Sequence, residues 1–84
     1  MKTTELIKDI IEELEVESVK EIRISQNLMD LDEWDSLNML MLLDYIKTKF
    51  DVTLSPDDHK KELTVQTIIN EIEKNSDVKI INDL

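Results

Sequence analysis

Residues 34–50 read WDSLNMLMLLDYIKTKF, and this stretch decides the fold. Its apolar side chains recur three and four positions apart, which places them on one face of an α-helix; they are Met39, Leu42, Leu43, Ile46 and Phe50. Asp35, just before Ser36, is a residue type that caps helix N-termini. The stretch therefore predicts a helix that begins at Asp35 or Ser36, ends near Phe50 and turns this face toward a core.

Two more amphipathic helices flank this one. From Thr4 onward, an apolar face recurs at helical spacing, formed by Leu6, Ile7, Ile10, Ile11 and Leu14. Thr64 can cap a last helix that ends near Lys74 and Asn75 and whose apolar face is formed by Val65, Ile68, Ile69 and Ile72. Each helix needs a partner to cover its apolar face, so the three are expected to share one core.

The connections complete the expected fold. After Val16 the periodicity breaks, and the residues up to Asp35 predict a long ordered loop with scattered apolar anchors and a short helical turn. Ser55, Pro56 and the acids after them predict the start of a short helix. The fold class is therefore all-α: a small four-helix bundle of three main helices and one short helix, with a long loop between the first two. Residues 1–75 are expected to form the domain, and residues 76–84 a C-terminal tail that either packs on it or frays.

Composition excludes several classes of function. Eighty-four residues allow one domain. A formal charge of −10 disfavours nucleic acid and anionic membranes as partners, and the absence of glycine removes the loops that usually cradle phosphates. There is no cysteine, no visible secretory signal, and no apolar run near the roughly 20 residues that cross a bilayer. We expect a cytoplasmic monomer.

No catalytic or metal-binding set stands out in the sequence. The only histidine, His59, lies in a run of charged residues without a nucleophile beside it, and is expected to be a solvated helix residue. Asp30, Asp32 and Asp35 suggest a calcium loop, but Trp34 occupies a ligand position, the turn glycine is absent, and Met41 stands where a bidentate glutamate is required. We therefore expect neither an enzyme nor a metal site.

The order of these features resembles the acyl carrier protein family. Asp35-Ser36-Leu37 opens a helix after a long loop; alone, these three residues could simply be a helix cap. Other residues lie at family-like distances from this motif: Leu28 and Leu31 before it, Phe50-Asp51 at the end of its helix, and Thr64-Val65-Gln66 at the start of the last helix. The resemblance covers roughly residues 3–74.

The resemblance implies a function for Ser36. In that family, the serine of this motif receives 4′-phosphopantetheine from coenzyme A, and the arm carries acyl or aminoacyl groups as thioesters. The implied partners are a phosphopantetheinyl transferase, a loading ligase or acyltransferase, and downstream enzymes of fatty-acid, polyketide or nonribosomal peptide type. Two departures favour a stand-alone carrier of a specialised pathway: Trp34 beside Glu33 replaces a glycine-containing turn, and the second helix carries few acids on its exposed face.

The predicted helix phase leaves a candidate recognition face. With the apolar stripe turned inward, Leu37, Met41 and Asp44 point outward and Leu40 lies on a flank. Together with Asp35 they form the expected partner-recognition set. Two alternatives remain open: Met41 packs under the long loop, or the chain is an unmodified helical interaction domain that binds a partner through Leu37, Leu40 and Met41.

Overall fold

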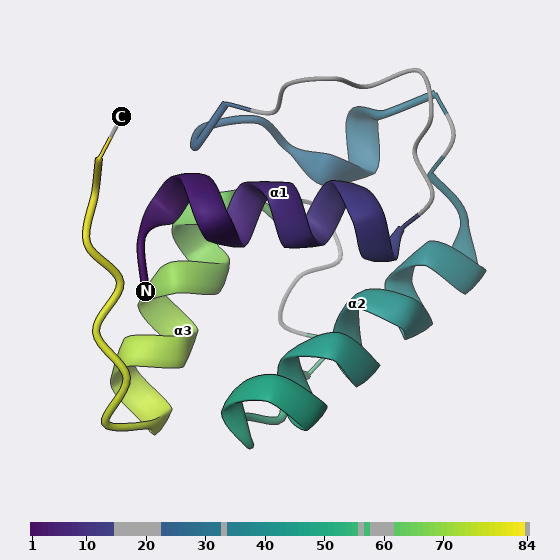
Figure 1. Ribbon diagram of the computed structural model, residues 1–84. Helices are drawn as coiled ribbons and strands as arrows, with labels where there is room; N and C mark the ends of the chain where they lie inside the picture. The colour runs from purple at the N-terminus through teal and green to yellow at the C-terminus, as the bar shows by residue number, and fades with distance from the viewer. Residues whose placement is uncertain (15–22, 33, 56, 58–61, 84) are drawn as a thin grey trace.

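The computed structural model describes residues 1–14, 23–32, 34–55, 57 and 62–83. This part of the chain contains three α-helices and no strand: α1 (Thr3–Glu13), α2 (Ser36–Phe50) and α3 (Val65–Asn75), with a 3₁₀ helix, η1 (Leu28–Asp30), between α1 and α2 (Figure 1). The predicted starts of α2 and α3 are confirmed. The mostly helical fold is confirmed as well.

The fourth helix of the predicted bundle is not shown. The expected short helix after Pro56 lies almost entirely on residues outside the described part, and so does His59. Within the long connection the described residues contain only the single turn of η1, where a short helical turn was expected. The four-helix bundle therefore stays a prediction.

Local capping explains the ends of α2 and the start of α3. Oδ1 of Asp35 accepts a 2.8 Å hydrogen bond from the Asn38 amide, and Oγ1 of Thr64 accepts a 3.1 Å bond from the Thr67 amide. At its other end α2 stops at Asp51, whose φ of 57° is left-handed. Glycine usually takes this position, but the chain has none, and aspartate tolerates it better than most residues.

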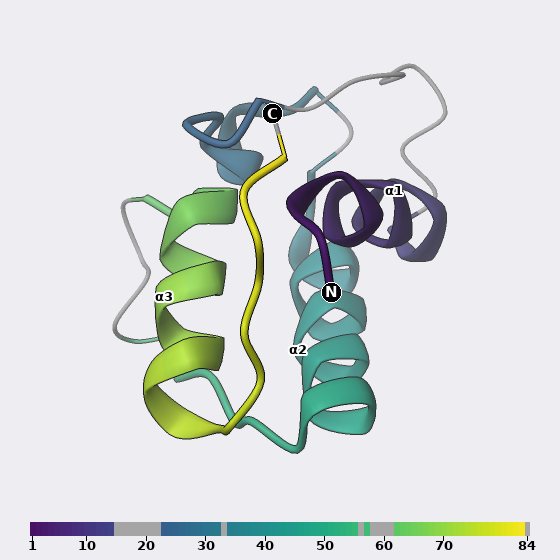
Figure 2. The ribbon, with the colours of Figure 1, turned by 60° about the vertical axis from the view of Figure 1, so that its left-hand side comes forward.

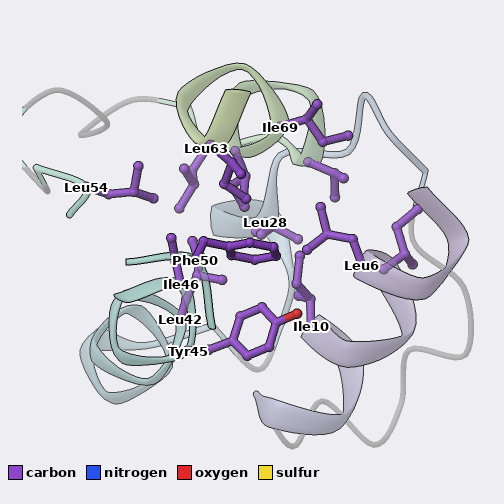
Figure 3. Packing of buried hydrophobic residues seen from close by; sticks show 14 of the residues in the cluster. Leu6, Ile10, Leu28, Leu42, Tyr45, Ile46, Phe50, Leu54, Leu63 and Ile69 are labelled. Atoms are coloured by element: carbon purple, nitrogen blue, oxygen red, sulfur yellow. The ribbon is translucent and has the colours of Figure 1, made fainter. Parts of the chain in front are cut away.

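Side chains from all three helices and from the loops meet in one hydrophobic core (Figure 3). The fully buried members on the helices include Leu6, Ile10, Leu42, Ile46, Ile68 and Ile72. Leu28 and Leu63 close the cluster from the two connections, and the rings of Tyr45 and Phe50 meet edge to face with centroids 6.0 Å apart. The radius of gyration of 11.8 Å is that of a compact domain of this length.

The buried face of α2 matches the predicted one in part: Leu42, Ile46 and Phe50 are buried as predicted. Tyr45 and Asn38 are only 9 % and 8 % exposed, whereas Met39 and Leu43 are half-buried. The face is therefore rotated about the helix axis toward Asn38 and Tyr45. The apolar residues from Leu37 to Leu43 lie almost all round the helix, so their spacing fixes the helix but not its phase.

The C-terminal residues pack on the domain instead of fraying. They run back beside α3 to the start of α1 (Figure 2), where Ile81 forms a parallel bridge with Lys2. Ile80 is buried in the core cluster. The tail that the sequence left undecided is thus part of the packed structure.

Candidate functional site

Ser36 is an exposed residue at the first position of α2. The carboxylate of Asp35 caps the helix, as the sequence predicted, by accepting the Asn38 amide. The Asp35 carbonyl accepts the first hydrogen bond of the helix, 3.2 Å from the Met39 amide. The backbone around Ser36 is therefore held in place by the start of α2 itself.

The segment that leads to Ser36 is anchored to the loop before α3. Oδ1 of Asn27 accepts hydrogen bonds from the amides of Met29, at 3.1 Å, and Leu63, at 3.0 Å. The Leu28 amide donates to the Leu63 carbonyl at 2.9 Å, and the Leu28 side chain is fully buried. One asparagine thus ties η1 to the residues just before α3. Sequence reasoning missed this residue, because its partner lies 36 positions away.

Trp34 provides the last anchor before the serine. Its amide donates a 3.0 Å hydrogen bond to the Leu31 carbonyl, and both side chains are half-buried against the core. Ser36 is therefore flanked by the hydrogen-bonded Trp34 on one side and by α2 on the other. A group attached at Ser36 would start from a fixed point on an exposed helix end.

The position of Ser36 suits an attached anion. The first amides of an α-helix have no partner within the helix, and the positive end of its dipole favours a nearby anion by roughly 0.3–1 kcal/mol at an exposed site. A phosphodiester on the Ser36 oxygen would lie at this end of α2. The serine thus offers an accessible hydroxyl with a favourable setting for a phosphate.

An exposed apolar patch lies beside the serine. Leu37 and Leu40 are 62 % and 63 % exposed, and Asp44 is exposed further along the helix. Two orientation predictions need correction: Met41, expected to point outward, is half-buried against the core, and Leu40, expected on a flank, is outward. Both follow from the rotated phase of α2. We define the patch Leu37 and Leu40 as the α2 patch.

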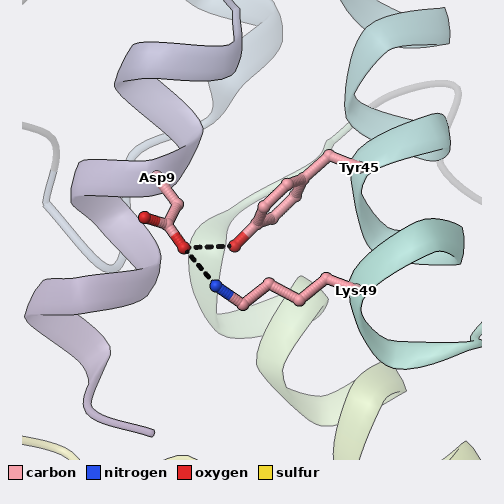
Figure 4. Close-up of polar contacts among 3 residues, drawn as sticks. All are labelled: Asp9, Tyr45 and Lys49. Atoms are coloured by element: carbon pink, nitrogen blue, oxygen red, sulfur yellow. Dashed lines mark hydrogen bonds and ion pairs between the residues drawn. The ribbon is translucent and has the colours of Figure 1, made fainter.

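A polar groove of about 320 Å³ lies between α1 and α2. It is lined by Asp9, Glu13, Asp44, Tyr45, Thr48 and Lys49. The Tyr45 hydroxyl and the Lys49 ammonium both bind Oδ2 of Asp9 at 2.8 Å (Figure 4). These contacts join the two helices beside the core.

Burial, charge and hydrogen bonding shift the pKa values of Asp9 and Tyr45. Partial burial acts to raise the pKa of Asp9, but the hydrogen bonds from Lys49 and Tyr45 and the nearby lysine charges bring it below its ordinary value. Burial, then the neighbouring Asp9, raise the pKa of the Tyr45 hydroxyl. Asp9 is therefore a carboxylate and Tyr45 a neutral donor at neutral pH. The feature of the sequence that could have indicated this cluster is the pair Tyr45 and Lys49, which lie four positions apart and so on one face of the helix.

Comparison of the chain with known protein families, with curated proteins and with solved structures gave no match. The described helices are all too short or too polar to cross a bilayer. Among the described residues, no group of three or more histidine, aspartate or glutamate side chains could hold a metal ion.

Proposed function

We propose that this chain is a carrier protein that holds acyl or aminoacyl thioesters on a 4′-phosphopantetheine arm attached to Ser36. The observation that carries the proposal is the exposed serine at the first position of α2, directly after the Asp35 cap and at the end of an anchored loop. The resemblance in motif order and spacing supplies the identity of the arm. The proposed carrier domain spans residues 1–75, with residues 76–83 packed on it, and the chain acts as a substrate handle, not as an enzyme.

Attachment of the arm is a phosphoryl-group transfer carried out by a separate transferase. The Ser36 hydroxyl oxygen attacks the phosphorus that bears the pantetheine group in coenzyme A. The bond from that phosphorus to the bridging oxygen breaks, adenosine 3′,5′-bisphosphate leaves, and the serine proton passes to a base on the transferase. Such a reaction requires that Ser36 can be reached from solvent, which its exposure supports.

The α2 patch is the proposed first contact for these partners. Exposed apolar side chains beside a modification site favour docking. Truncating an anchor at the centre of an interface can cost about 2 kcal/mol or more of binding. Charge should contribute less to partner binding here than on a uniformly acidic helix. Asp51 is paired with Lys47 at 2.8 Å, and Asp44 is the acidic residue within α2. We propose Asp35, Leu37, Leu40, Met41 and Asp44 as the recognition residues, with Met41 contributing only its exposed part.

The proposal is tested by incubating the protein with coenzyme A and a broad-specificity phosphopantetheinyl transferase and measuring its intact mass. The parent should gain one phosphopantetheine group, and Ser36→Ala should gain none. Ser25→Ala is the matched control, because Ser25 is an exposed serine that lies in a turn and not at a helix start. Ser25→Ala should be modified like the parent.

The rival function is an unmodified interaction domain that binds through Leu37, Leu40 and Met41. It is favoured by the same exposed patch. The mass measurement distinguishes the two functions, because an unmodified interaction domain should show no change in mass with any transferase. If no transferase modifies the parent, the α2 patch becomes the starting point for that second function.

A further inference from the structure

Helix α1 does not supply its own N-terminal cap. Lys2 occupies the cap position, and its side chain makes no capping hydrogen bond. Instead, the Thr3 amide donates to the Ile81 carbonyl at 2.9 Å, and the Thr4 amide donates to Oδ1 of Asp83 at 3.0 Å. Two of the amides that a helix leaves unpaired are thus satisfied by residues from the other end of the chain.

Further contacts hold the same segment, residues 79–83, which we call the C-terminal strap. The Ile81 amide donates to the Met1 carbonyl at 2.9 Å, and the Thr4 hydroxyl binds the second oxygen of Asp83. On the other side, the Ile80 amide donates to Oε2 of Glu73 on α3 at 3.2 Å. Figure 2 shows the strap running between α3 and the start of α1.

The strap is bound mainly by polar contacts. Ile80 is its one buried apolar side chain, at 8 % exposure, whereas Ile81 is an exposed apolar residue. Segments with few buried apolar contacts and exposed backbone hydrogen bonds open locally at a lower free energy than the whole domain. The strap has few buried apolar contacts, and its hydrogen bonds to Thr4 are exposed to solvent, whereas each core helix buries several apolar side chains.

We propose that the C-terminal strap is a detachable cap for α1, which holds the first turn of the helix closed and can open without unfolding the core or the Ser36 site. The position of the two features supports this separation: the strap meets the start of α1, and the start of α2 lies near the opposite end of α1 (Figure 1). This inference does not depend on the carrier function. It concerns a conformational device at the end of the domain remote from Ser36.

Closure of the C-terminal strap should depend on pH. Hydrogen bonds from the Thr4 hydroxyl and amide, and the charge of Lys2, lower the pKa of Asp83 below its ordinary value. A carboxyl group whose pKa is lowered in the closed state favours closure above its ordinary pKa and loses that contribution as the pH falls through the lowered value. The charged groups near the contact are Lys2, whose charge acts on Asp83, the Met1 ammonium, which donates to the Lys79 carbonyl at 3.4 Å, and Glu73 on α3, which accepts from the Ile80 amide. Protonation of Asp83 should therefore open the strap at acid pH.

Amide hydrogen exchange by NMR tests the proposal on the full chain. Asp83→Ala should raise the exchange rates of the Thr3, Thr4 and Ile81 amides about fivefold, the effect expected for loss of one helix cap. In the parent, these three amides should exchange with a lower opening free energy than the amides of Leu42 and Ile46 in the core of α2. Asp77→Asn is the matched control, because Asp77 is an exposed acid of the same tail outside the strap, and it should change none of these rates.

A second variant separates charge from hydrogen bonding. In the parent, the protection of the Thr4 amide, corrected for its intrinsic exchange rate, should fall between about pH 5 and pH 3, where an aspartate protonates. Asp83→Asn keeps an acceptor oxygen but cannot titrate, so this fall should be absent in the variant. Equal opening free energies for the strap and α2 amides in the parent would overturn the proposal, since the strap would then open only with the whole domain. Unchanged Thr3 and Thr4 exchange would overturn it as well, since the strap would not cap the helix.

Discussion

The Tyr45 hydroxyl donates a 2.8 Å hydrogen bond to Oδ2 of Asp9, and this contact joins α2 to α1 beside the core. The ring of Tyr45 is buried against Phe50, while its hydroxyl reaches the polar groove. Asp9 also binds Lys49 at 2.8 Å. One carboxylate therefore accepts a partly buried hydrogen bond from Tyr45 and an exposed one from Lys49, and the two contacts should differ in strength.

Tyr45→Phe should lower the free energy of unfolding by about 1 to 2 kcal/mol, because it removes a partly buried hydrogen bond to a charged group and leaves the ring in place. Urea unfolding followed by circular dichroism measures the change. Lys47→Gln is the control, since Lys47 pairs with Asp51 at the surface of α2 and should contribute between zero and about 1 kcal/mol. Equal losses in the two variants would show that the Tyr45 contact is no stronger than a surface ion pair.

The effect of Tyr45→Phe should depend on pH. The pKa of Asp9 is lowered in the folded chain, so its contribution to stability is present above the ordinary aspartate pKa and is lost as the pH falls through the lowered value. The difference in unfolding free energy between parent and Tyr45→Phe should therefore be constant from about pH 5 to 7 and shrink below about pH 4. A difference that stays constant down to pH 2 would mean that the charge of Asp9 has no part in the contact.

The observed phase of α2 predicts opposite results for two leucines. Leu42→Ala should cost about 2 to 5 kcal/mol of stability, because Leu42 is fully buried. Leu40→Ala should cost no more than about 0.5 kcal/mol, because Leu40 is exposed. Only Leu40→Ala should leave the fold intact while slowing arm attachment, which is measured by the time course of intact mass. Attachment at the parent rate would place the docking surface elsewhere.

Asp51→Gly should stabilise the chain by about 0.5 kcal/mol, because Asp51 holds a left-handed backbone conformation that costs glycine less. Its exposed ion pair with Lys47 contributes little that would be lost. Asp44→Gly is the matched control: Asp44 is also exposed on α2 but lies inside the helix, where glycine costs about 1 kcal/mol relative to alanine. Thermal melts should rise for the first variant and fall for the second. A fall for both would mean that the backbone at Asp51 carries no strain.

The sequence predicted the helices well where a cap and a clear apolar face coincide. Asp35 and Thr64 marked the starts of α2 and α3, and both caps are formed by the predicted side chains. The phase of α2 was predicted less well, because its apolar residues surround the helix and the decisive burial of Tyr45 depends on a partner in α1. Periodicity within a helix does not contain that information.

Contacts between distant parts of the chain could not be predicted. Asn27 and Leu63 lie 36 positions apart, and Thr4 and Asp83 lie 79 apart. Neither pair belongs to a repeating pattern, so nothing in the sequence connects them. At the candidate site the sequence located Ser36 and its cap, whereas the loop anchors that fix its position emerged only from the fold.

The central claim is tested most directly on the protein purified from the cells that make it. Proteolysis followed by tandem mass spectrometry should find a 4′-phosphopantetheine group on the peptide that contains Ser36, and any thioester on the arm would identify the cargo. A chain that carries the unmodified Ser36 peptide alone, under conditions in which it is expressed and folded, would contradict the carrier function.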